Sequence, residues 1–353
     1  MTNPCAWFLS DLKKIPKNGV KVFSTFACGG GSSLGYKLAG CEVIGANDID
    51  PEMAYHYKLN HSPKYYFLMP IRELLTTELP TELFGIDILD GSPPCSTFSM
   101  AGSREKAWGK EKHFREGQAK QVLSDLFFDF LDVAEHLKPK VIIAENVKGM
   151  IQGNAKGYCK LVMARLKEIG YRPQLFLLNA ADCGVPQRRE RVFFCAVRED
   201  VSDKKLILAP KHRWISAGEA VSDLQVLTKE EIEYCYDLQK KSSSYYEKVK
   251  KGCSFSSVAN GDFFNHIKSD NSKPLNTISA AMATRNMLYH WSEKRGFSFR
   301  EFKRFGSFPD DYQAKTDKIG KYMIGMSVPP KMTEQVARAV CEQWLNVNYE
   351  VAT

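Results

Sequence analysis

A cysteine of this chain stands where an apolar run gives way to a loop. The run "FGIDILD" is followed by Gly91, Ser92 and two prolines, and Cys95 comes next. At the carboxyl end of a strand a thiol faces the edge where α/β sheets bind ligands, and a nearby cation would favour its nucleophilic thiolate form. The position makes Cys95 a candidate nucleophile, whereas for any one of ten cysteines a buried structural role is the usual alternative.

A carboxyl group and several arginines occupy similar positions further along the chain. Glu145 lies in "VIIAENVKGM", at the end of another apolar run, where partial desolvation favours a carboxyl that holds a proton. A helix-capping or loop-fixing role explains such an acid equally well. "VPQRRERVFF" places Arg188, Arg189 and Arg191 before a strand, and strand alternation would put Arg189 and Arg191 on one face. A solvated basic edge is the commoner outcome for a run of charges.

A glycine turn between a strand and a helix could hold a nucleoside. In "FACGGG" the backbone at Gly29, Gly30 and Gly31 would allow close approach of a ligand. Asp48 ends the next strand, where a carboxylate can accept hydrogen bonds from ribose hydroxyls. A tight turn without a ligand has the same pattern, and the third spaced glycine of a dinucleotide motif is absent.

Short apolar strands that alternate with helices must position these groups. The alternation extends over residues 20–197 and predicts an α/β fold, with a mostly parallel sheet that helices cover on both faces. The polar, serine- and tyrosine-rich stretch 198–273 shows no clean period and predicts a smaller irregular region. "PPKMTEQVARAVCEQWL" predicts a final amphipathic helix. We therefore expect one domain of residues 1–197 with 321–353, and a small domain of residues 198–320.

The composition is that of an ordinary globular protein, with 44% hydrophobic and 25% charged residues in a chain of 353. No run approaches the roughly 20 apolar residues of a membrane span, and the N-terminal segment is not a secretory signal. The ten cysteines include no C-x-x-C pair, which argues against a zinc ribbon and a disulfide framework and is typical of the cytosol. We expect no metal site. The net charge of +8 suits a polyanionic partner without identifying it.

In this order the motifs resemble those of the DNA cytosine-5 methyltransferases of bacteria and phages. The resemblance covers residues 20 to about 343. It implies a Rossmann-like S-adenosylmethionine-dependent methyltransferase fold with a small target-recognition domain. It also implies methyl transfer to C5 of a cytosine flipped out of double-stranded DNA. The motifs that carry it are "FACGGGSSLGY", "ANDIDP", "DGSPPCSTFS", "ENVKGM", "PQRRERVFF", "KPLNTISA", "GSFPDDY" and "IGMSVPPKM".

The resemblance also implies a role for each candidate residue. Cys95 is the nucleophile that adds to C6, and Glu145 protonates or hydrogen-bonds cytosine N3. Arg191 contacts the base carbonyl, and Arg189 supports the loop and the base. The loop 96–120 would close over the flipped base, and residues 198–273 would read the DNA sequence. The residues implied for S-adenosylmethionine are Phe26, Gly29, Gly31, Asp48, Ile49 and Leu126.

The resemblance extends to partners and location. It implies a monomer in the cytoplasm with no membrane partner, and it leaves open whether a cognate restriction endonuclease acts separately. Three residues depart from the family pattern. Pro70 replaces an acid that meets adenine, Met326 replaces an asparagine, and Ser96 stands where many members have glutamine. We expect the first two changes to weaken cofactor affinity or local order while leaving the chemistry intact.

Three other functions compete with this prediction. An RNA cytosine-5 methyltransferase would share the fold, but the Cys-Phe-Thr segment of the tRNA-modifying branch is missing. A catalytically silent DNA-binding relative is disfavoured by Cys95 and Glu145 and kept open by Pro70 and Met326. A dinucleotide-dependent oxidoreductase would explain the glycine turn alone.

Overall fold

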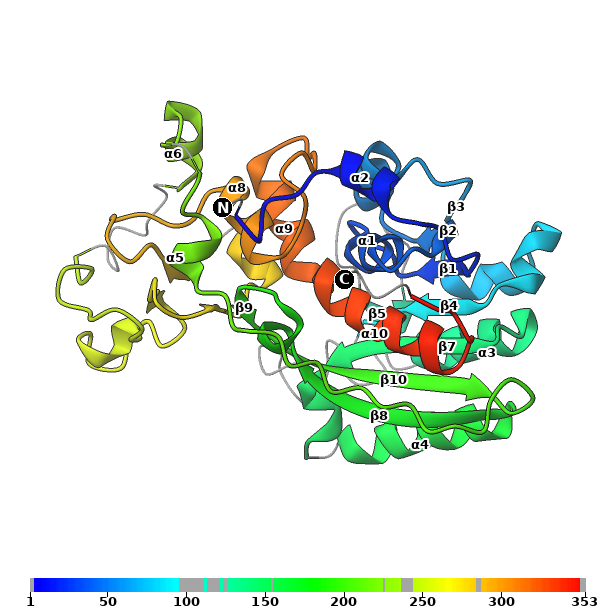
Figure 1. Ribbon diagram of the computed structural model, residues 1–353. Helices are drawn as coiled ribbons and strands as arrows, with labels where there is room; N and C mark the ends of the chain where they lie inside the picture. Colours follow the sequence, from blue (N-terminus) through cyan, green and yellow to red (C-terminus); the bar gives the residue numbers. More distant parts are fainter. Residues whose placement is uncertain are drawn as a thin grey trace. The chain divides into compact units, whose positions relative to one another are not determined.

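The computed structural model describes residues 3–94, 111–112, 121–122, 126–153, 155–224, 226–235, 244–283 and 287–349 (Figure 1). Cys95 and nearly all of the loop 96–120 lie outside the described residues. The chain divides into two compact units that alternate along the sequence. The sheet unit comprises Ile15–Leu178, Glu190–Pro210 and Thr333–Thr353, and the small unit comprises Met1–Lys14, Asn179–Arg189 and Lys211–Met332. Residue 198 thus falls within the sheet unit and residue 321 within the small unit.

The sheet unit is built on seven strands in the order β3-β2-β1-β4-β7-β10-β8. The first five of these are parallel to their neighbours, and β10 runs antiparallel to β7. The prediction of an α/β fold with a mostly parallel sheet is confirmed. The strand bounds are Lys21–Thr25 (β1), Glu42–Asp48 (β2), Tyr65–Leu68 (β3), Ile88–Gly91 (β4), Val141–Val147 (β7), Tyr171–Asn179 (β8) and Glu190–Arg198 (β10).

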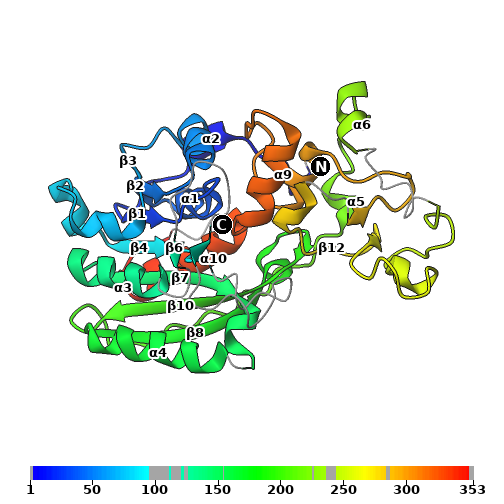
Figure 2. The ribbon, with the colours of Figure 1, turned by 180° about the vertical axis from the view of Figure 1, so that it is seen from behind.

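Helices cover both faces of this sheet because alternate residues of its strands are apolar on each side. One core joins the strands to α3 and α4, which lie on the opposite side from α10 (Figures 1 and 2). On the α10 side, Cys41 Sγ lies 3.7 Å from Cys341 Sγ, and an Arg338 guanidinium N–H donates to the Leu38 carbonyl. The helices are α1 (Gly31–Leu38), α2 (Pro51–His61), α3 (Leu126–Leu137), α4 (Ala155–Glu168) and α10 (Pro330–Gln343).

The amphipathic helix predicted around residues 126–137 forms as α3. Its apolar positions recur at three- and four-residue spacing, and this places them on one face, toward the sheet. The ring of Phe130 packs directly on the end of β4, where a Cβ added to Gly91 would come within 2.5 Å of it. The six residues predicted to form this face are all buried: Leu126, Phe127, Phe130, Val133, Ala134 and Leu137.

Short turns of 3-10 helix connect the elements of the sheet unit. They are η2 (Ile71–Leu75), η3 (Thr81–Gly85) and η4 (Lys148–Ile151). The two-residue strands β5 (Glu111–Lys112) and β6 (Gln121–Val122) pair with each other in antiparallel fashion.

The small unit has short elements and little regular sheet. Its strands form two parallel pairs, β9 (Gln187–Arg188) with β12 (Leu275–Asn276) and β11 (Ile267–Lys268) with β13 (Leu288–Tyr289). Its helices are α5 (Ala217–Ala220), α6 (Lys229–Cys235), α8 (Phe299–Phe305) and α9 (Asp317–Met326). Its 3-10 turns are η1 (Leu9–Lys14), η5 (Ala180–Cys183), η6 (Phe255–Ser257) and η7 (Ala280–Ala283).

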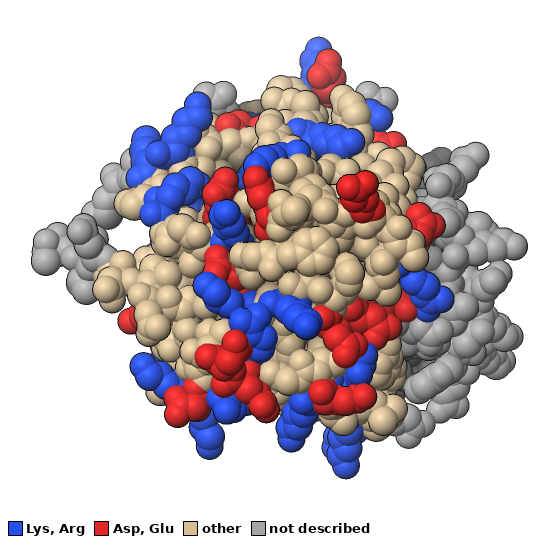
Figure 3. All heavy atoms as spheres, turned by 90° about the vertical axis from the view of Figure 1, so that its right-hand side faces the viewer, with Lys and Arg blue, Asp and Glu red and all other residues tan. Residues whose placement is uncertain are grey.

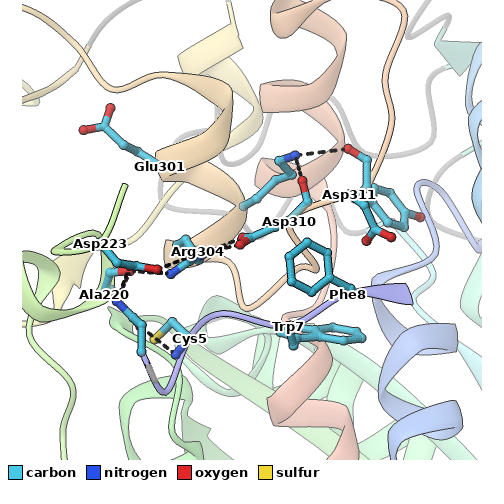
Figure 4. A network of polar contacts seen from close by, with 12 residues as sticks. Cys5, Trp7, Phe8, Ala220, Asp223, Glu301, Arg304, Asp310 and Asp311 are labelled. Carbon is cyan, nitrogen blue, oxygen red and sulfur yellow. Dashed lines mark hydrogen bonds and ion pairs between the residues drawn. The ribbon is translucent and has the colours of Figure 1, made fainter. Parts of the chain in front are cut away.

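A buried arginine joins distant segments of the small unit. Arg304 on α8 is 2% exposed and donates to Asp223 at 3.0 and 3.1 Å and to Asp310 Oδ2 at 2.6 Å. Asn3 Nδ2 donates to the same Asp223 carboxylate, and Trp7 donates its indole N–H to the Ser307 carbonyl. Figure 4 shows Arg304 between its two carboxylates, with the N-terminal segment beside them. Charged and polar contacts therefore connect the N-terminal segment, Asp223 and α8 of this unit.

Surface features add two observations. No helix in the described part of the chain is long and apolar enough to span a membrane. The face drawn in Figure 3 carries acidic and basic side chains intermixed, without a patch of one sign. The positive net charge is therefore not concentrated on that face.

Candidate active site

Glu145 and Arg191 form a largely buried ion pair in the sheet unit. Arg191 Nε lies 2.8 Å from Glu145 Oε1, and the two side chains are only 14% and 11% exposed. The register explains the contact, because Phe193 on β10 faces Glu145 on β7, and Arg191 lies two residues away on the same side of the sheet. Sequence motifs some 45 residues apart are thus brought together by one antiparallel strand pair.

The surroundings of this pair favour recognition of a polar planar group. Burial lowers the pKa of the Arg191 guanidinium, and the neighbouring Glu145 carboxylate opposes that shift. An arginine remains a cation under such conditions. A carboxyl oxygen and a cationic N–H donor therefore lie side by side in a low-dielectric site, where both act more strongly than they would in water.

Asn146 connects this strand to the turn that precedes Cys95. It is buried, and its Nδ2 donates to the carbonyl of Pro93 at 3.1 Å. Its Oδ1 accepts the backbone N–H of Val147. Since β4 and β7 are parallel neighbours, the amide fixes the proline turn against the strand that carries Glu145. Cys95 itself is outside the described residues, so its approach to Glu145 stays a prediction.

Asp90 is a second buried carboxyl that the sequence interpretation missed. Ser24 Oγ donates to it at 2.7 Å and the Tyr36 hydroxyl at 3.0 Å. Burial raises the pKa of Asp90 to about 7, the two hydroxyl donors oppose that shift, and the charge of Glu145 adds to it. The sequence signal for Asp90 was an acidic residue at the end of an apolar run. The proline turn therefore rests on a carboxyl that can change charge near neutral pH.

The glycine turn is held in strained backbone conformations around Asp48. Phe26 and Cys28 have positive φ angles of 50° and 46°, and such strain in non-glycine residues is typical of ligand sites. Asp48 accepts the backbone N–H groups of Cys28 at 2.7 Å and Asp50 at 2.9 Å. Burial raises the pKa of Asp48 to about 6 although these two donors oppose the shift. The Asp48 carboxylate therefore holds the backbone of the glycine turn in place.

Gly30 cannot be replaced in this turn. Its φ is +79°, and a Cβ placed there would lie 2.0 Å from His61 Nε2. His61 stacks on Tyr57 with ring centroids 4.3 Å apart, and Lys37 Nζ lies 3.2 Å from its Nδ1. Burial lowers the pKa of His61 well below its ordinary value, so the ring supports the turn as a neutral group.

A polar atom near Asp48 fits the demands of a nucleoside. The hydroxyl of Tyr66 on β3 is buried and has no hydrogen-bond partner among the described residues. Burial and the Asp48 carboxylate both raise its pKa. Ile49 is half-buried next to Asp48, and Leu126 is buried at the start of α3. An acceptor, a hydroxyl and apolar surface are the groups that a ribose with an attached base requires.

Arg189 belongs to the small unit and has a different environment from Arg191. The strand is interrupted between β9 and β10 at Arg189, so the expectation of one strand carrying both arginines on one face fails. Arg189 is buried and donates to the carbonyls of Ile278 at 2.6 Å and Gly325 at 3.2 Å. It therefore braces the backbone of two segments that the sequence interpretation did not connect.

The departures at Pro70 and Met326 remove polar groups without disturbing their surroundings. Pro70 caps η2, and the carbonyls of Phe67 and Met69 beside it accept from Asn47 Nδ2 at 2.9 Å each. Met326 is the last residue of α9 and is exposed. Neither side chain can supply the hydrogen bond that an acid or an asparagine would make.

Comparisons with known proteins agree with this geometry. A family model described as C-5 cytosine-specific DNA methylase matches residues 20–342. The Type II methyltransferase M.NgoFVII of Neisseria gonorrhoeae is 28% identical over 353 residues, covering 94% of this chain and 89% of that protein. M.DdeI of Desulfomicrobium norvegicum is 27% identical, with 93% and 90% covered.

Solved structures share the fold. A candidate DNA modification methyltransferase encoded within a prophage (E. coli) superposes with a TM-score of 0.71 at 18% identity, covering 93% of this chain and all of that one. A mutant of Spodoptera frugiperda DNMT2 gives 0.63 at 19% identity, covering 91% and 99%.

Proposed function

Because the chain belongs to the C-5 cytosine-specific DNA methylases and is therefore a DNA (cytosine-5)-methyltransferase, we propose that it methylates a flipped-out cytosine within one short DNA sequence by covalent attack from Cys95. The observation that supports this mechanism most is the buried pair of Glu145 and Arg191. Ring atom N3 and the 2-carbonyl oxygen of cytosine are neighbours, and a carboxyl beside a guanidinium matches them. The fixed proline turn supports the attack, since it limits the positions that a following thiol can take.

In the proposed reaction the thiolate of Cys95 adds to C6, and the electron pair of the C5–C6 double bond moves into the ring. Glu145 protonates or hydrogen-bonds N3, while Arg191 stabilises the charge that develops on the 2-carbonyl oxygen. S-adenosylmethionine, when bound, would supply the methyl group that the nucleophilic C5 takes up, and S-adenosylhomocysteine would be the leaving group. Transfer of the C5 proton to water then restores the C5–C6 double bond and expels the Cys95 thiolate by β-elimination, while N3 returns any proton it received to Glu145.

The remaining site residues hold the participants in place. Asp48 would accept the ribose hydroxyls of S-adenosylmethionine, with Ile49 against its adenine. Asn146 is a positioning residue for the turn before Cys95. Arg189 braces the backbone carbonyls of Ile278 and of Gly325 on α9. Phe26, Gly29, Gly31 and Leu126 complete the proposed cofactor site.

The proposal extends to organisation and partners. The stretch 198–273, within a small domain of residues 198–320, would select the DNA sequence, and residues 1–197 with 321–353 would carry the chemistry. The substrate would be double-stranded DNA, and the bacterial relatives favour an enzyme that acts in the cytoplasm. The relatives are named Type II methyltransferases, which favours a separately acting restriction endonuclease. We expect the enzyme to be a monomer.

The test expresses the wild type and Cys95→Ala in a host that lacks cytosine methylation and maps 5-methylcytosine at base resolution. We expect methylation in one short context from the wild type and none from Cys95→Ala. Cys159→Ala is the control, because Cys159 on α4 is buried and burial raises the pKa of its thiol. Equal methylation by Cys95→Ala would reject the nucleophile, and an unmethylated genome with soluble wild type would reject this function.

A further inference from the structure

Part of the small unit forms a lobe with an aromatic core of its own. This aromatic lobe comprises residues 244–269 and 287–291, and it buries Tyr246, Phe255 and Tyr289 around Val249. The rings of Phe255 and Tyr289 lie 4.7 Å apart, and the Tyr246 hydroxyl donates to the His290 carbonyl at 2.6 Å. The strands β11 and β13 pair within it. Such packing makes the lobe a defined platform.

One loop of this lobe adopts an unusual backbone. The Phe264 loop, residues 258–266, has positive φ at Asn260 (49°), Gly261 (91°) and Phe263 (58°). A bulky residue in this region is a genuine outlier and costs of order 1–3 kcal/mol. The loop is nevertheless closed by hydrogen bonds, from Ser254 Oγ to the Phe264 carbonyl at 2.8 Å and from Phe255 N–H to the His266 carbonyl at 2.8 Å.

The strained backbone separates two neighbouring aromatic side chains. Phe263 packs inward, with its ring 5.3 Å from that of His266 and 6.2 Å from that of Tyr245. Phe264 is 73% exposed. Single exposed apolar residues are common on protein surfaces. Here, however, a costly conformation places one in water at the tip of an ordered loop, and this demands a reason beyond packing.

The groups around Phe264 are those that nucleic acid recognises. Asn260 and Asn265 in the same loop are exposed, and amide side chains can pair with base edges. Lys248, Lys250 and Lys251 are exposed in the preceding segment of the lobe. Residues 244–269 hold four lysines against two acids. Cores of protein–protein interfaces are depleted in lysine, so the lysines favour DNA over a second protein as the occupant.

We propose that Phe264 makes an apolar contact with a base of the target DNA, and that this contact helps to determine which sequence is methylated. The inference rests on the proposed function and names the residue that acts within its recognition region. The lysines of the lobe would hold phosphates without reading sequence, whereas the ring and the two amides would read base edges. Phe264 is thus a specificity-determining residue.

The experiment compares full-length wild type, Phe264→Ala and Phe264→Leu on duplexes that carry the mapped target and all its single-base changes. We expect Phe264→Ala to raise KM for DNA about tenfold, with kcat nearly unchanged, and to relax discrimination at one position. Phe264→Leu should keep most of the wild-type KM for DNA and most of the discrimination between sequences. Lys250→Gln should instead weaken the binding of all DNA sequences by a similar factor and reduce the salt dependence of binding.

Phe8→Ala is the matched control, since Phe8 belongs to the same unit, is 49% exposed and lies outside the recognition stretch 198–273. Unchanged KM and unchanged discrimination in Phe264→Ala would overturn the proposal, as would a change in oligomeric state or in melting temperature that accounts for the loss. If the wild type failed to methylate any DNA, the proposed function would fail instead. Fluorescence anisotropy with duplex DNA would still test Phe264, and equal affinity of wild type and Phe264→Ala would reject the contact.

Discussion

The two units differ in how they treat buried polar groups. In the sheet unit the strands are apolar, and Asp90 and Glu145 are buried near the carboxyl ends of β4 and β7. In the small unit, buried arginines join segments that have no sheet between them, as Arg304 does with Asp223 and Asp310. A buried charge therefore has different roles in the two units. In the sheet unit these two carboxyls lie at the candidate active site, and in the small unit the buried arginines link separate segments of the chain.

The largest effect should come from removing the acid of the sheet unit. Glu145→Gln keeps an oxygen that can accept from Arg191 but cannot transfer a proton. We expect methyl transfer to slow by about 10²–10⁴-fold, the range typical of a lost general acid. Single-turnover transfer of labelled methyl groups measures the rate. Glu190→Gln is the control, because Glu190 is the exposed neighbour that pairs with Lys148. An unchanged rate in Glu145→Gln would move the acid elsewhere.

The next effect should be structural and confined to the small unit. Arg304→Met leaves two partly exposed carboxylates without their cation, and we expect a loss of about 2–3 kcal/mol in the free energy of unfolding. Hydrogen exchange should rise first around Asp223 and Asp310. Arg213→Met is the control, because Arg213 is mostly exposed and its 2.6 Å pair with Glu219 should contribute about 1 kcal/mol or less. Equal stability of the two variants would contradict the contrast between the units.

A smaller effect, which appears in the pH dependence of the free energy of unfolding, should come from Asp90. Its raised pKa means that the folded state keeps a proton that the unfolded chain releases, so this group destabilises the fold as pH rises from about 4 to about 7. Asp90→Asn can still bond the hydroxyls of Ser24 and Tyr36 but does not titrate. We expect the variant to gain on the order of 2 kcal/mol over wild type between pH 5 and pH 8. Denaturant unfolding at several pH values measures this gain, and a pH-independent difference would rule the explanation out.

Periodicity and motif order were enough to predict the sheet unit. The apolar spacing of α3 and the alternation of strands and helices are local properties, and the structure confirms both. The motifs placed Glu145 and Arg191 in one site because strand ends meet at one sheet edge. Asn146 and Asp90 were missed because their partners lie 53 and 54–66 residues away, at Pro93 and at Tyr36 and Ser24.

The small unit resisted prediction for a physical reason. Several contacts of its buried arginines are ion pairs, such as Arg295 with Glu301 and Arg304 with Asp223, and a charge that will be buried has the same sequence signature as one in solvent. The interruption of the strand at Arg189 was equally hidden, since "QRRERVFF" contains no glycine or proline to mark a break. Sequence periodicity detects the apolar faces of helices and strands, and it does not reveal which charged residues will be buried.

The N-terminal segment of the small unit is synthesised long before the residues that it contacts. Asn3 bonds Asp223, and the Leu9 backbone N–H bonds Asp311, at separations of 220 and 302 residues. At roughly 5–20 residues per second, synthesis needs about 15–60 s to pass from Leu9 to Asp311. The seven strands of the sheet emerge within that interval. We therefore expect the sheet to assemble on the nascent chain first, while the small unit closes around its N-terminal segment only after Asp311 has been synthesised.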